Sequence, residues 1–175
     1  MSSTVQPKAT ETPQEYTRRI LSYTEGKDAL GVLQSTADRL RTIVRTNAAA
    51  ALRRKPAPGR WSPVEIMAHL ADAEIVFSYR LRMIVARNGV AIQAFDQNEW
   101  AANLRYDAID PEESVELFDA TRRANLSLLR RIDPSRHENY GMHSERGRET
   151  VSHLIRLYAG HDLNHLGQLE RMLSG

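Results

Sequence analysis

Helix start signals recur along this chain, and most of them are followed by a long amphipathic stretch. Segments 12–15 (TPQE) and 62–65 (SPVE) place a hydroxyl residue, a proline and a glutamate in the order of a capping box. Trp61 and Ile66 flank the second box at the positions of a hydrophobic staple. Segment 110–113 (DPEE) repeats the cap, proline and acid. These signals predict helices that begin directly after each cap.

The apolar residues between these starts recur at helical spacing. In the first long helix, which follows Asp28, they are Leu30, Leu33, Ala37, Leu40 and Val44. This helix frays through 48–52 and stops at the PAPG breaker, 56–59. A short helix precedes it, towards Gly26.

Three further long helices complete the pattern. They are expected from Ser62 to about Arg87, from Asp110 to about Ile132, and from near Thr150 to the end of the chain. A short helical turn is expected at 95–100, a loop at 133–149, and no β-strand. The prediction is an all-α four-helix bundle with short extra helices: a single domain at 12–175 behind a flexible tail at 1–11.

Composition narrows the class of protein. Of 175 residues, 41% are hydrophobic and 26% charged, as in an ordinary globular domain. There is no membrane-length apolar run and no apolar leader at the start, so we expect a cytoplasmic protein without a membrane partner. The net charge is only +2 and no basic face is visible, so no nucleic-acid partner is expected. The absence of cysteine excludes disulfides, Cys-based zinc sites and a cysteine nucleophile.

Two histidines lie on the inward face of the last helix. His161 and His165 are one turn apart in the series Val151, Leu154, Tyr158, His161, His165, Gln168 and Met172. His69 lies on the inner edge of the second long helix. Buried imidazoles can share a divalent metal, or each can bond to a neighbouring carbonyl or carboxylate; spacing alone leaves both open. A zincin peptidase is not expected, because Asp162 replaces the glutamate of that motif and only ten residues follow His165.

Three segments carry a family resemblance. Segments 61–74 (WSPVEIMAHLADAE), 147–154 (GRETVSHL) and 160–169 (GHDLNHLGQL) resemble the second-helix and last-helix motifs of the DinB-like (DinB/YfiT-like) superfamily, a group regarded as metalloenzymes. The resemblance extends over roughly 25–173. It implies an up-down-down-up bundle that holds a divalent metal, often zinc or nickel. The implied ligands are His69, His161 and His165.

An open three-histidine site would suit catalysis. The superfamily that these segments resemble includes thiol-S-transferases that use bacillithiol or mycothiol. The resemblance therefore implies a metal-dependent transferase or hydrolase that acts on a small molecule. A thiol would have to come from a co-substrate. The alternative is a non-catalytic bundle, or stress-related binding protein, in which the metal locks two helices together at a dimer contact. The expected protein partner is a second copy of the chain, in a homodimer.

Other polar side chains are candidates for roles around the metal. Asp72, Tyr158 and His143 are candidate catalytic residues, and Glu65 and Gln168 could orient an imidazole or a substrate. Each also has a structural interpretation: Asp72 could pair with an arginine, Tyr158 could fill the core, and His143 could be a solvated loop residue. His153 is expected at the surface or in a cap.

Overall fold

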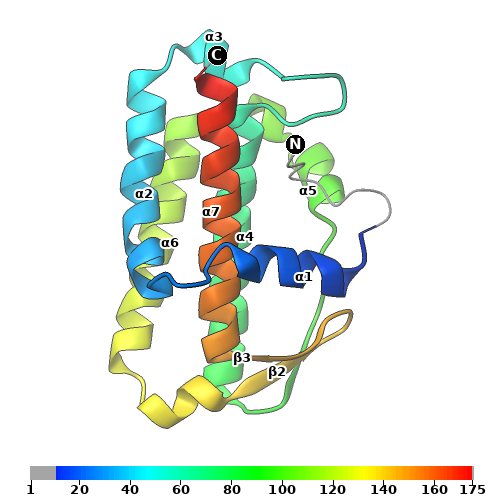
Figure 1. Ribbon diagram of the computed structural model, residues 1–175, viewed down its shortest axis with the longest axis vertical. Coiled ribbons are helices and arrows are strands. Elements are labelled where there is room, and N and C mark those ends of the chain that lie inside the picture. Colours follow the sequence, from blue (N-terminus) through cyan, green and yellow to red (C-terminus); the bar gives the residue numbers. More distant parts are fainter. Residues whose placement is uncertain (1–10, 175) are drawn as a thin grey trace.

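Four long helices form the body of the protein. The structure, a computed structural model, describes residues 11–174 (Figure 1). The long helices are α2 (Ala29–Thr46), α4 (Pro63–Ala86), α6 (Pro111–Arg131) and α7 (Val151–Leu173). In Figure 1, α2 and α7 run upward and α4 and α6 run downward, which confirms the up-down-down-up order. Both α6 and α7 pack against α2 and α4.

Shorter helices precede or connect the long helices of the bundle. They are α1 (Pro13–Ser22), α3 (Ala49–Arg53), α5 (Gln97–Asn103) and the 3₁₀ turns at Tyr106–Ala108 and Pro134–Glu138. Helix α5 confirms the helical turn expected near 95–100, and the frayed end of the first long helix is the separate helix α3. No helix among residues 11–174 combines the length and the apolar character needed to cross a membrane. Residues 1–10, which make up nearly all of the predicted tail, lie outside the described residues.

Both predicted capping boxes are formed. At the start of α4, Glu65 N–H donates to Ser62 Oγ at 3.4 Å, and Ser62 N–H donates to the Glu65 carboxylate at 2.7 Å. Thr12 and Glu15 make the same reciprocal pair before α1. In α4 the apolar residues at helical spacing are all buried: Ile66, Leu70, Ala73, Phe77, Leu81 and Ile84. In α2 the stripe was wrong at Leu30, whose side chain is 39% exposed at the first turn.

A small sheet contradicts the expectation of no β-strand. It consists of β1 (Val90–Ile92), β2 (Tyr140–His143) and β3 (Gly147–Thr150), with β1 parallel to β2 and β2 antiparallel to β3. Strands of three or four residues are too short to show the alternation by which a sequence reveals a strand. The sheet joins the connection after α4 to the connection before α7, at the lower end of the bundle (Figure 1).

Helix α1 crosses α7 at a glycine. A Cβ atom on Gly160 would stand 2.1 Å from the carbonyl oxygen of Ile20, so only glycine permits this approach. Figure 1 shows α1 lying across α7. Gly160 directly precedes His161, so the crossing covers α7 beside a candidate metal ligand.

Substitution of Gly160 by alanine is expected to lower the free energy of unfolding by about 1–3 kcal/mol, because the added methyl group meets backbone. Gly167→Ala is the matched control on the same helix, since its Cβ would meet only the flexible end of Arg171, at 3.3 Å. We expect the control to be neutral or more stable by up to about 1 kcal/mol, from helix propensity. Urea denaturation measures both, and equal effects of the two changes would contradict the close crossing.

Candidate metal centre

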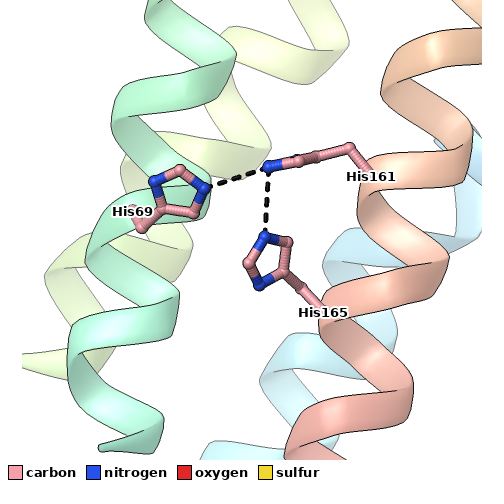
Figure 2. Close-up of side chains that lie close together, drawn as sticks. All are labelled: His69, His161 and His165. Atoms are coloured by element: carbon pink, nitrogen blue, oxygen red, sulfur yellow. Dashed lines mark hydrogen bonds between the residues drawn. The ribbon is translucent and has the colours of Figure 1, made fainter. Parts of the chain in front are cut away.

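Three imidazole rings converge between two helices. His69 projects from α4, and His161 and His165 project from α7 towards it (Figure 2). The Nε2 atom of His161 lies 3.0 Å from Nε2 of His69 and 3.1 Å from Nε2 of His165. All three residues are buried, and their ligand atoms lie within 4.8 Å of one another. The structure thus brings together the three histidines implied by the resemblance.

Hydrogen bonding alone cannot account for this cluster. The Nε2 atom of an imidazole has one in-plane direction, where it either donates a proton or accepts one. Both contacts in the cluster use Nε2 of His161. One proton, or one lone pair, would therefore have to serve both contacts, and at most one of them can be a well-directed hydrogen bond. A divalent metal removes the conflict, because nitrogens bound at about 2.0–2.1 Å in a tetrahedral site stand about 3.3 Å apart. The donor set fits such an ion.

Burial keeps the three rings neutral. It lowers the pKa of His161 to about 3 and takes the pKa values of His69 and His165 well below 6.5. The neighbouring imidazoles lower the pKa values of His69 and His165 further, and the Gln168 side chain opposes the shift at His165. Neutral rings offer lone pairs, which is the form that binds a metal.

The pKa shifts predict that the metal-free protein loses stability in mild acid. A histidine with a lowered folded-state pKa binds protons more readily when the chain is unfolded. Its stabilising contribution is therefore complete above pH 6.5 and is lost as the pH falls from 6.5 towards 3, the value for His161. Thermal unfolding of chelator-treated protein between about pH 7.5 and 5 should show a falling melting temperature. A flat profile over this range would contradict neutral, buried histidines.

The cluster forms part of the wall of an open cavity. The cavity has a volume of about 500 Å³, and His69 and His161 line it together with Ala73, Leu157 and Tyr158. His165 is not among the lining residues, so it supports the cluster from behind. A metal on the three Nε2 atoms would therefore have protein on one side and the cavity on the other.

Of the candidate catalytic residues, Tyr158 lines the cavity, and His143 contacts a lining residue, Arg80. The ring centroid of Tyr158 lies 6.3 Å from that of His161. His143 is buried on β2 and faces Arg80, with 3.4 Å between its Nε2 atom and Arg80 Nη2. The solvated-loop interpretation of His143 was therefore wrong, because the strand that buries it was not predicted.

Two of the other candidates, Asp72 and Glu65, have structural partners. Asp72 accepts a hydrogen bond of 2.6 Å from the hydroxyl of Tyr106 rather than from an arginine. Glu65 belongs to the capping box and pairs with Lys55 at 2.8 Å. Gln168 lies one turn after His165, with its Oε1 atom buried. That oxygen has no hydrogen-bond partner among the described residues.

A buried ion-pair network lies behind the histidines, and sequence reasoning missed it. Arg122 on α6 bonds to Glu74 on α4 at 2.8 Å and to Asp162 on α7 at 2.7 Å. Asp162, the residue at the general-base position of the zincin motif, therefore forms an ion pair with this arginine. The sequence did indicate that Arg122 is buried, because it lies four residues after Phe118 and three before Asn125. All three therefore share the face of α6 that packs inward.

Comparison with known proteins adds a family match. A model described as "DinB superfamily" matches residues 11–169. Two proteins of Oceanobacillus iheyensis, each named "Putative metal-dependent hydrolase", are 30% and 25% identical over 111 and 117 residues, or 63% and 66% of this chain. These matches span 64% and 66% of the relatives, less than two thirds of their length. A like-named protein of Geobacillus kaustophilus is 26% identical over 63% of each chain.

A solved structure matches the fold. YfiT from Bacillus subtilis, described as "a probable metal-dependent hydrolase with an unusual four-helix bundle topology", aligns with a TM-score of 0.74. The match covers 97% of this chain and 93% of that one, at 19% sequence identity. At this identity the match establishes the fold only, and the reaction has to be inferred from the residues of this chain.

Proposed function

Because the chain belongs to the DinB superfamily, we propose that it is a metal-dependent hydrolase acting on a small molecule held in the cavity. The observation that carries the proposal is the position of the histidine cluster. His69 and His161 line the cavity, so a metal held by the cluster would be accessible to a substrate. A purely structural site would have its coordination closed by protein ligands. The names of the curated relatives support hydrolysis as the reaction.

The protein's own residues supply the metal ligands, an apolar wall and a hydrogen-bond donor. His69, His161 and His165 would hold a divalent metal, zinc or nickel, which supplies Lewis acidity and activates water when bound. Leu157 and Ala73 give the cavity an apolar wall beside the cluster. Burial raises the pKa of Tyr158, so its hydroxyl keeps its proton and can donate a hydrogen bond to substrate.

Removal of the metal is the direct test of this proposal. Purified protein is loaded with zinc or nickel and assayed against a panel of small carboxylic esters, amides and lactones. We expect hydrolysis that a chelator abolishes and that returns when the metal is restored. Activity that persists in metal-free protein would contradict a metal-dependent mechanism. A metal-loaded protein that hydrolyses no member of the panel would count against the hydrolase proposal.

Thiol transfer is the second candidate function. The cavity would give a co-substrate thiol access to the metal, and the chain has no cysteine that could compete for it. Loss of a low-molecular-weight thiol in the presence of an electrophile distinguishes the transferase from the hydrolase, which consumes only water. The non-catalytic alternative is disfavoured by the open cavity beside the cluster. A homodimer and a cytoplasmic location stay predictions.

A further inference from the structure

A buried arginine forms another part of the cavity wall. Arg80 lies on α4, about three helical turns after His69, and its side chain is only 4% exposed. The guanidinium donates to the backbone carbonyl of Gln93 at 2.7 Å and to the hydroxyl of Tyr158 at 3.4 Å. Among residues 11–174 it has no carboxylate partner in an ion pair. A buried cation without a counter-ion is costly, which indicates that the cavity is built to receive a negative charge.

The carboxylates that line the cavity are engaged elsewhere or lie at its rim. Glu11 makes two hydrogen bonds with Arg19, at 2.8 and 3.0 Å. Asp96 caps α5 by accepting two backbone N–H groups. Glu145 is an exposed residue of the turn between β2 and β3. None of the three forms an ion pair with Arg80.

The groups that touch Arg80 add no negative charge. Nδ1 of His143 accepts hydrogen bonds from the backbone N–H groups of Glu145 and Arg146, so the proton of the neutral ring is on Nε2, which faces Arg80. Burial and the charge of Arg146 lower the pKa of His143 to about 4, and burial raises that of Tyr158. This end of the cavity therefore has a surplus of hydrogen-bond donors.

The second arginine of the cavity is already neutralised. Arg146 forms a two-pronged pair with Glu149, at 2.7 and 3.1 Å. Arg80 is thus the cavity cation that remains available for a ligand among the described residues. Its guanidinium matches the paired oxygens of a carboxylate or a phosphate.

We propose that Arg80 and the hydroxyl of Tyr158 bind an oxyanion, a carboxylate or a phosphate, at the far end of the substrate from the histidine cluster. The substrate is then an elongated small molecule with its reacting group at the histidines and its anionic group at Arg80. The position of the reacting group rests on the proposed function, whereas the anion site rests on Arg80 alone. His69 and Arg80 lie about 16 Å apart along α4, and the arginine side chain shortens this span.

The test uses hydroxamates as two-ended probes, because a hydroxamate binds divalent metals. Monohydroxamates of straight-chain dicarboxylic acids of increasing length are compared with their methyl esters, and with matching phosphonates, by calorimetric titration of zinc-loaded protein. At one chain length we expect the anionic probe to bind about tenfold to a hundredfold more tightly than the ester. The better of the carboxylate and phosphonate series identifies the anion. Equal affinities of anionic and neutral probes at every length would overturn the proposal.

Variants assign the effect to Arg80. Arg80→Gln should remove the preference for the anionic probe and Arg80→Lys should retain part of it, while Arg87→Gln, an exposed site at the end of the same helix, should leave it unchanged. A preference that survives Arg80→Gln would overturn the assignment; if that variant does not fold, the lysine variant and the wild-type probe series still decide. Repeating the titrations with metal-free protein separates the two proposals. A preference for anionic probes that persists there supports the Arg80 site even if no metal binds, and its absence in both forms refutes it.

Discussion

Replacing Arg122 by alanine is expected to lower the free energy of unfolding by about 3–5 kcal/mol. Its side chain is 2% exposed and joins carboxylates from two other helices, Glu74 and Asp162, as well as the backbone carbonyl of Leu33 on α2 at 2.8 Å. Its guanidinium also stacks on the ring of Phe118, 4.5 Å from the centroid. Burial already raises the pKa of Glu74, and Arg122 opposes that shift. Without the arginine, two buried carboxylates would lose their counter-ion.

Denaturant titration checks this prediction, and Arg123→Ala is its control. Arg123 is 73% exposed, and its partner Asp119 also pairs with Arg41, so loss of Arg123 should change stability by no more than about 0.5 kcal/mol. A triple variant, Glu74→Leu, Arg122→Met and Asp162→Leu, should be more stable than Arg122→Ala, because it leaves no uncompensated charge. If Arg122→Ala and Arg123→Ala changed the free energy of unfolding equally, the ion-pair network would not contribute to stability.

Replacing His165 by alanine is expected to weaken binding of a divalent metal about a hundredfold or more. A structural zinc site in a small peptide is worth about 10–16 kcal/mol, so the loss of one ligand removes several kcal/mol. His165 supports the cluster from behind the cavity wall, so its removal takes away a ligand without altering a cavity-lining residue. Wild-type protein should gain about 2.7 kcal/mol of stability when free metal is a hundred times its dissociation constant. The variant should gain little at the same concentration.

His153→Ala is the matched control for this experiment. His153 lies on α7, near Glu149 at 3.9 Å, and is outside the histidine cluster. Calorimetric titration with zinc or nickel should give the wild-type affinity for this control. Equal metal affinities of wild type and His165→Ala would remove His165 from the ligand set.

Sequence reasoning recovered most of the fold, because the elements that carry it have strong local signals. The boxes at Thr12 and Ser62 mark helix starts through bonds within four residues, and the stripe of α4 reports its buried face directly. The sheet was missed because its strands are short and pair across distant parts of the chain: Val90 lies opposite Gly141. Such pairing leaves no local pattern.

The metal ligands could be predicted from the sequence, whereas the partners of the buried arginines could not. The spacing of His161 and His165 predicted a shared face, but His69 comes from another helix and needed the family resemblance. Arg80 and Arg122 are long cations at positions that the helical period marks as buried. Their partners come from other helices, strands or loops, so local sequence could indicate burial without indicating what each arginine binds.

If His69, His161 and His165 hold one divalent metal at the wall of the cavity, the ion will be visible in the anomalous-difference map of a crystal of zinc-loaded protein. We expect one strong peak about 2.0–2.1 Å from each of the three Nε2 atoms, with no further protein ligand on the cavity side. A peak at other residues, a fourth protein ligand that closes the site, or no peak at the cluster would contradict this metal site.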